Sequence, residues 1–415
     1  MSSVADQQSD AAADDSLARR NALVLALAQA FAGANNIVIV GTVGILGGTF
    51  GDKAYATVPV SAFVVGMWAG TLPVGVIAKR YGRRAAFLAG ATCGGIAGLI
   101  LAAATYYASF VGLCIGSLFG GFYAAAHQSY RFAAADTASE AFRPKAISWV
   151  LAGGVFAGVL GSQLTIATQD LLSPYLFAAS YLAQTAIAIL AVAVLWLVKI
   201  PLPASDGAVG EGRPLSDIFR QPRLIMAVFC GVVSYSMMNL IMTSAPIAMV
   251  DCNHSITDAT LGLQWHVIAM FGPSFFTGSL IAKFGTSRVI GSGFVIMGMS
   301  VAVALSGLTI WHFWVALALL GAGWNFAFIA ATALVTQCHR PTELNKVQAV
   351  NDFLVFGSMA VGSFASGQLL ANYGWDVVNQ VALPGIFVAF LLLLLVGMKP
   401  KANPAGAASI EHPKA

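Results

Sequence analysis

The sequence predicts an all-α membrane protein with twelve transmembrane helices in two pseudo-symmetric six-helix halves. Three observations predict it. Of the 415 residues, 58% are hydrophobic and only 9% are charged. Long apolar stretches follow one another, and short motifs recur about half a chain apart. Because soluble domains carry about 25% charged residues, this composition excludes a soluble globular protein, a disordered protein and a nucleic-acid binder.

The apolar stretches are long enough to cross a bilayer, for which about 20 residues suffice. Backbone polar groups must be satisfied internally in lipid, so each stretch is expected to be a helix. The expected spans are 21–46, 55–78, 85–106, 108–131, 146–169, 175–198, 224–248, 259–282, 288–308, 311–336, 347–371 and 377–398. The acidic segment 1–18 lacks the basic start of a signal peptide and is expected to be a disordered cytoplasmic tail, with a second tail at 399–415.

The basic residues predict the orientation. With twelve spans, Lys53 is the one residue among the 21 Lys and Arg that falls on the side opposite the N-terminus. By the positive-inside rule, the side that carries the other basic residues is cytoplasmic. Both termini are therefore expected in the cytoplasm. The protein is expected to be a multi-pass membrane protein that is embedded in the lipid bilayer.

The chain divides at its midpoint and repeats. The Pro- and Gly-rich segment 199–223 is expected to be a cytoplasmic linker between the halves 19–198 and 224–398. GVIAKRYGRR (75–84) is echoed by GSLIAKFG (278–285), which lies 203 residues later. Duplicated halves are typical of secondary transporters, whose substrate site lies between the halves near the bilayer midplane. A single chain is expected to work as a monomer.

The loop GVIAKRYGRR resembles the signature G-x-L-A-D-R-x-G-R-R of the major facilitator superfamily. The matching positions, expected to form a conformational loop, are Gly75, Lys79, Arg80, Gly82, Arg83 and Arg84. Lys79 stands where the family usually has Asp, an acid that helps to lock this loop. Asp352 is a candidate for the missing negative charge, paired with Lys79 or Arg80. Alternatively, Asp352 only stabilises the start of its helix through the helix dipole.

Methionine and histidine form two spaced pairs on the seventh and eighth spans. Met238 and Met242, and likewise His266 and Met270, are four residues apart, so each pair shares a helix face. Thioether sulfur selects Cu(I), and imidazole also suits copper. The sequence therefore offers a candidate copper-binding site at Met238, Met242, His266 and Met270. The alternative is that the methionines are ordinary apolar filling between helices.

Further soft or basic side chains are candidates for an accessory metal path. These are Met237, Cys230, Cys252, His254 and His127. The five cysteines contain no CxxC pair, which argues against a disulfide framework and a zinc site.

The segments SMMNLIMTSAP (236–246) and WHVIAMFGPS (265–274) resemble those of the CcoA-type copper importers within this superfamily. That resemblance implies copper import across the bacterial inner membrane for assembly of cbb-type cytochrome c oxidase. Copper is then the cargo and no cofactor is expected. A copper chaperone is a possible receiving partner.

Two other functions stay open at this point. One is a proton-coupled exporter of neutral or cationic small organic molecules, with the Met and aromatic side chains as an apolar wall. The other is a membrane chaperone that hands over copper without transporting it. An enzyme is not expected, because the sequence shows neither a nucleophile–base set nor a phosphate-binding GxxxxGK[ST] loop.

Overall fold

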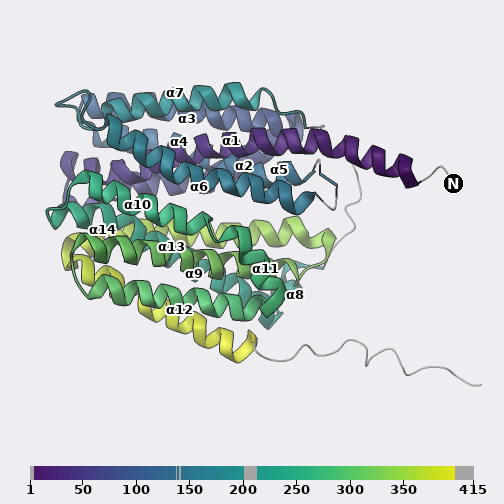
Figure 1. Cartoon of the computed structure of the whole chain (residues 1–415). Coiled ribbons are helices and arrows are strands. Elements are labelled where there is room, and N and C mark those ends of the chain that lie inside the picture. The colour runs from purple at the N-terminus through teal and green to yellow at the C-terminus, as the bar shows by residue number, and fades with distance from the viewer. Residues whose placement is uncertain (1–3, 137, 140–141, 201–212, 398–415) are drawn as a thin grey trace, which may run out of the picture.

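A computed structural model describes residues 4–136, 138–139, 142–200 and 213–397. Throughout these ranges the regular structure is helical, and no strand occurs in them. The long helices lie side by side along one axis (Figure 1). The all-α membrane fold predicted from composition is thereby confirmed.

The first part of the chain forms α1 (Val4–Phe50), η1 (Lys53–Tyr55), α2 (Val58–Tyr81), α3 (Arg83–Tyr106), α4 (Phe110–His127), α5 (Tyr130–Asp136), α6 (Arg143–Thr168) and α7 (Ala178–Leu195). The second part forms α8 (Leu215–Ile218), α9 (Pro222–Asp251), α10 (Ile256–Phe271), α11 (Ser274–Phe284), α12 (Thr286–Leu305), α13 (Ile310–Thr336), η2 (Pro341–Glu343), α14 (Leu344–Leu392) and the short π-helix η3 (Leu393–Gly397).

Among the described residues, ten helices are long and apolar enough to cross a membrane, and α10 with α11, bent by 41°, makes an eleventh. The stretch Lys346–Val396 holds two spans. At 1.5 Å per residue its 51 residues would reach about 75 Å, against a hydrocarbon core of about 30 Å. Gly374 breaks it with φ 81° and ψ 179°. The break lies between the expected spans 347–371 and 377–398, which brings the number of spans to twelve.

Two local expectations differ from the structure. The segment 1–18 was expected to be disordered, but α1 begins at Val4. Its alanines favour helix, and its early aspartates suit the positive end of the helix dipole. The span expected at 108–131 ends earlier, because α4 stops at His127 and a separate short helix, α5, follows. Residues 201–212 of the expected linker, residue 398 at the end of the last expected span and the expected tail 399–415 lie outside the described residues.

The repeat is visible in the backbone. Gly82 separates α2 from α3 with φ 87° and ψ 160°, and Gly285 separates α11 from α12 with φ 83° and ψ 157°. A positive φ of this size is easy only for glycine, so both motifs need it at the same place. The two halves of the fold therefore turn their equivalent helices in the same way.

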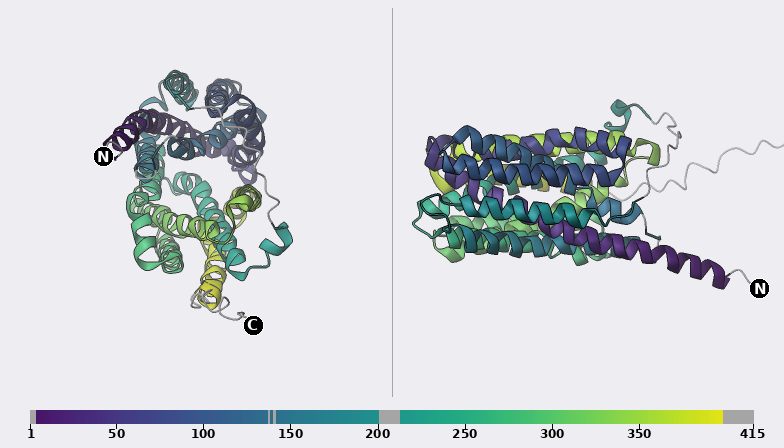
Figure 2. Two further views of the ribbon diagram at one scale, coloured as in Figure 1. Left: turned by 90° about the vertical axis from the view of Figure 1, so that its right-hand side faces the viewer. Right: turned by 90° about the horizontal axis from the view of Figure 1, so that it is seen from above.

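The helices pack as two groups, α1–α7 and α9–α14 (Figure 2, left). Contact between the groups runs mainly through α6 with α10 and α2 with α14. We call the end where α2 finishes and α9 starts the basic end, and the opposite end the far end. At the basic end, Arg213 donates from Nε to Glu343 Oε1 at 2.7 Å, which fixes the start of α8 to the loop before α14.

Glycines of the first group face side chains of the second group. A Cβ on Gly41 would lie 3.1 Å from Leu263, and one on Gly44 would lie 3.2 Å from Ile247. In α6, a Cβ on Gly154 would lie 2.9 Å from the Phe271 ring, and one on Gly158 would lie 3.2 Å from Val267. The first group thus presents a surface with few projecting side chains to its partner.

Candidate functional site

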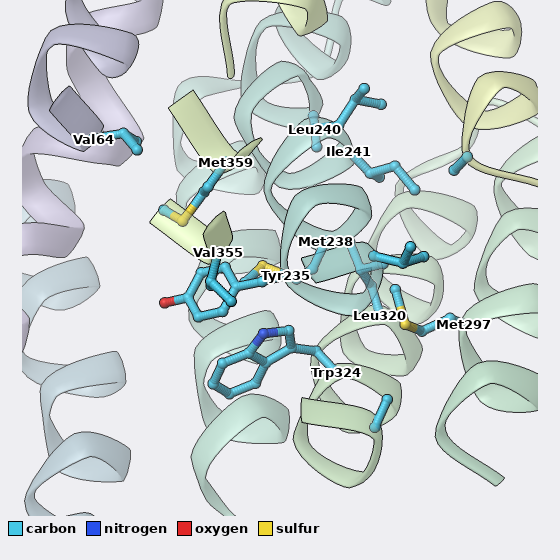
Figure 3. Close-up of a cluster of buried hydrophobic side chains, with 14 of the residues drawn as sticks. Val64, Tyr235, Met238, Leu240, Ile241, Met297, Leu320, Trp324, Val355 and Met359 are labelled. Carbon is cyan, nitrogen blue, oxygen red and sulfur yellow. The ribbon is translucent and has the colours of Figure 1, made fainter. Parts of the chain in front are cut away.

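An aromatic cluster lies on α9 and α13, in the middle of the second group. The rings of Trp324 and Phe328 are stacked, with centroids 5.1 Å apart and planes at 14°. The Tyr235 ring stands edge-on to both, at 5.1 Å and 4.8 Å. Figure 3 shows the Tyr235 hydroxyl pointing toward the side on which Val64 of α2 lies. The cluster therefore presents a polar tip to the first helix group.

A polar group faces it from α1 and α4. Asn36 Nδ2 lies 2.7 Å from His127 Nε2. Because an amide nitrogen can only donate, the imidazole accepts at Nε2 and carries its proton on Nδ1. The helix stops at His127, and Gln128 follows it directly, in the turn between α4 and α5.

Arg131 connects the two sets of residues. Its guanidinium interacts electrostatically with Tyr235 of α9 and with Asp352 of α14, and Gln128 interacts with the Tyr235 hydroxyl. In the described chain, Arg131 and Asp352 do not form a direct ion pair within 4.0 Å. We call Asn36, His127, Gln128 and Arg131 the polar group, and Tyr235, Trp324 and Phe328 the aromatic cluster.

Several polar atoms here are buried without a partner among the described residues. They are Asn36 Oδ1, His127 Nδ1, Arg131 Nε and Trp324 Nε1. A buried polar atom without a hydrogen bond costs free energy, and folded proteins leave few of them. Three of them are N–H donors and one, Asn36 Oδ1, is an acceptor, so together they could hydrogen-bond a bound molecule that carries both acceptors and a donor.

The four expected copper ligands are all placed inside the protein. Met238 is 2% exposed and lies beside Tyr235 and Leu320 (Figure 3). Met242 packs with a small apolar cluster that includes Val267. Met270 is half-buried against the main apolar core.

The His266 side chain turns toward α13. It is fully buried, and its Nδ1 lies 2.8 Å from the carbonyl oxygen of Leu317. A carbonyl can only accept, so Nδ1 is the protonated nitrogen. Met242 packs against the apolar cluster of Ile37, Ala157, Leu263 and Val267, whereas the imidazole is directed to α13.

The expected accessory path is scattered. Met237 lies against Gly385, Cys230 Sγ lies 3.9 Å from the Ala389 oxygen, and His254 Nε2 lies 2.7 Å from the Leu308 oxygen at the far end. Cys252 follows directly after α9, and His127 belongs to the polar group. The described residues contain no group of three His, Cys, Asp or Glu side chains that could hold a metal ion.

The expected conformational loop lies at the basic end. Lys79 and Arg80 are exposed, Arg83 pairs with Asp136 at 2.8 Å, and the Arg84 guanidinium lies 4.7 Å from the Trp196 ring centre. The pairing of Asp352 with Lys79 or Arg80 stays a prediction; Arg131 is the cation with which it interacts. Since α14 begins at Leu344, Asp352 does not lie at the helix start.

The aromatic cluster was missed by reasoning from sequence. The spacing of Trp324 and Phe328 places them on one helix face, which is a usable signal. Nothing in the sequence shows that Tyr235, about 90 residues earlier, meets them edge-on.

Comparison with known proteins gives consistent results. Two overlapping stretches, residues 25–273 and 227–415, match the model of the Major Facilitator Superfamily. The chain is 45% identical over 397 residues to the riboflavin transporter RfnT of Brucella anthropi, which covers 95% of this chain and 100% of the relative. It is 29% identical to the uncharacterized MFS-type transporter YdeG of Bacillus subtilis, over 92% of both chains.

Two solved structures share the fold. The nucleoside transporter NupG aligns with a TM-score of 0.71 and 14% identity, over 92% of this chain and 100% of that one. FucP in its outward conformation aligns with a TM-score of 0.60 and 16% identity, over 91% and 99%.

The prediction of copper import is wrong. A relative with 45% identity over its whole length transports riboflavin, which agrees better with the alternative, a carrier of small organic molecules. The physical reason lies in the packing: Met238 and Met242 fill apolar contacts between helices, as methionine commonly does. The His266 and Met270 pair stays a prediction as a binding element, with His266 Nε2 buried and unpartnered among the described residues.

Proposed function

Because the chain belongs to the major facilitator superfamily, we propose that it transports riboflavin or a closely related flavin across a membrane by alternating access. The observation that carries the proposal is the 45% identity to a riboflavin transporter over the full length of that relative. The superfamily consists of transporters, a kind of protein that is generally not enzymatic, and the proposal involves no chemical step on the cargo.

The chemistry of the site supports a flavin. Riboflavin has a flat three-ring system and a chain of hydroxyl groups, and it carries no fixed charge. Stacked and edge-on aromatic side chains suit a flat ring, since such contacts contribute beyond simple burial. Unpartnered donors and acceptors in the polar group suit its oxygens and nitrogens.

Contacts between the two helix groups support a rocking motion. At the far end, Lys53 pairs with Asp251 at 2.9 Å, Gln368 donates to the Ala54 oxygen at 2.6 Å, and Gln169 donates to Thr257 at 3.3 Å. These bonds join the groups at that end, whereas Arg131 and Asp352 form no ion pair within 4.0 Å among the described residues. In the proposed cycle the far-end bonds break when the cargo site opens there.

The proposed location is the inner membrane of a bacterium, with both termini in the cytoplasm. The distribution of Lys and Arg supports this orientation. The proposed direction is uptake into the cell.

The test is growth of a bacterium that can neither make nor import riboflavin. Expression of this chain is expected to restore growth at low external riboflavin and to permit uptake of radiolabelled riboflavin. Trp324→Leu is expected to impair uptake, and the control Trp311→Leu, at an exposed ring 70% accessible, is expected to retain it. Absence of uptake by a well-expressed wild-type protein would overturn the proposal.

A further inference from the structure

The central site has two unlike sides, one aromatic and one made of hydrogen-bonding atoms. We propose that the polar group recognises an imide edge, O=C–NH–C=O, on a flat ring that rests on the aromatic cluster. This inference rests on the proposed function, because the pyrimidinedione edge of a flavin is such an imide. The inference assigns the carrier's choice of substrate to the polar group, and Asn36 is the residue on which that choice depends most.

The hydrogen-bonding pattern of the polar group complements an imide. The bond from Asn36 to His127 leaves Asn36 Oδ1 as a free acceptor and His127 Nδ1–H as a free donor. Arg131 adds a second free donor, its Nε–H. An imide edge offers one donor between two acceptors, so two donors and one acceptor satisfy all three of its atoms.

These atoms belong to one neighbourhood. Asn36 and His127 are bonded at 2.7 Å, and His127 interacts electrostatically with Arg131. Arg131 in turn interacts with Tyr235, whose ring touches both members of the stacked pair. Gln128, which follows His127 directly, hydrogen-bonds the Tyr235 hydroxyl and so joins the polar group to the aromatic cluster.

The aromatic side supplies a surface but little selectivity. Trp324 and Phe328 are nearly parallel, with planes at 14°; Trp324 is the buried member of the pair, and Phe328 is the half-buried member left to contact a ligand ring. Stacking favours any flat ring, whereas hydrogen bonds reject a ring that leaves their buried atoms unpaired. The imide edge is thus the feature on which the protein distinguishes similar rings.

The experiment compares two flavins that differ at the imide nitrogen. Riboflavin and 3-methylriboflavin, whose N–H is replaced by N–CH3, are titrated into the purified full chain in detergent, and binding is followed by quenching of flavin fluorescence. The same pair is measured for Asn36→Ala and Trp324→Leu. Asn379→Ala is the matched control, because that buried Asn also has one amide atom bonded and its Oδ1 unpartnered, but it lies on α14.

Wild type is expected to bind riboflavin at least about tenfold more tightly than the methylated form. Asn36→Ala is expected to reduce this ratio toward one. Trp324→Leu is expected to weaken both ligands by a similar factor and to reduce quenching, and Asn379→Ala is expected to keep the wild-type ratio. Equal affinity of wild type for the two flavins overturns the inference, as does a ratio unchanged in Asn36→Ala.

Failure of the inference and failure of the proposed function give different results. If cells take up riboflavin but the protein does not distinguish the two flavins, the function stands and the inference fails. Lumichrome, which has the imide ring without the hydroxyl chain, tests the opposite case. If cells take up no riboflavin, yet wild type prefers lumichrome over its N3-methyl form and Asn36→Ala does not, the inference stands. Binding of neither ring overturns both.

Discussion

Replacing Gly161 by alanine should destabilise the contact between α1 and α6. A Cβ at Gly161 would lie 2.8 Å from the Ala34 oxygen and 2.9 Å from Ala34 Cα and Ile37 Cβ. Two of these three atoms belong to the backbone, so no side-chain rotation relieves the overlap. To reach 3.4 Å, where ordinary contact begins, α1 and α6 must separate by about 0.6 Å. Overpacking of this kind costs about 1–3 kcal/mol.

The substitution also brings a gain, because alanine favours helix over glycine by about 1 kcal/mol. Gly298→Ala in α12 isolates that gain, since no atom lies within 4 Å of its Cβ position. The difference in unfolding free energy between the two variants is therefore expected to be about 1–3 kcal/mol, with Gly161→Ala the less stable. Thermal unfolding in detergent, followed by loss of the monomer peak on size exclusion, measures it. Equal stability of the two variants would refute the packing argument.

Three further results are expected. Hydrogen bonds from Arg213 hold the pKa of Glu343 at about 2 instead of 4.5, so the stability they add is present above pH 4.5 and lost as pH falls toward 2. The melting temperatures of wild type and Glu343→Gln should differ at pH 7, begin to converge below pH 4.5 and meet at about pH 2; a constant gap contradicts this. Gly154→Ala, whose methyl would meet the Phe271 ring of the other helix group at 2.9 Å, should slow riboflavin uptake severalfold relative to Gly298→Ala; equal uptake by the two variants contradicts it. Met238→Leu, which keeps side-chain volume, should cost less than about 1.5 kcal/mol and preserve uptake; loss of uptake at normal expression counts against the packing role.

Much of the fold follows from the sequence, since the cost of unsatisfied backbone groups in lipid dictates helices wherever the chain is apolar for long enough. The local departures have local causes. The break after His127 falls at a polar run, His127-Gln128-Ser129, which a prediction from the length of apolar stretches includes in the span 108–131. The continuation of α1 back to Val4 depends on helix propensity rather than on hydropathy.

The site was predicted less well because side-chain direction depends on distant helices. The spacing of His266 and Met270 gives a shared helix face, but it does not say which neighbour that face meets. The imidazole direction is set by the Leu317 oxygen of α13, which is 51 residues away in the sequence. The same holds for Tyr235, whose role appears only once α13 supplies its two aromatic neighbours.

The glycines of α1 and α6 that face the second helix group bear on how fast an empty carrier can reset. Where side chains interlock, a change of angle must first pull them apart, and that separation raises the activation barrier. At Gly41, Gly44, Gly154 and Gly158 the first group contributes no side chain, so only the side chains of the second group project into the contact. The two surfaces can therefore shift past each other with little loss of contact. A low barrier here would let the unloaded protein return quickly, leaving release of the cargo as the slow step.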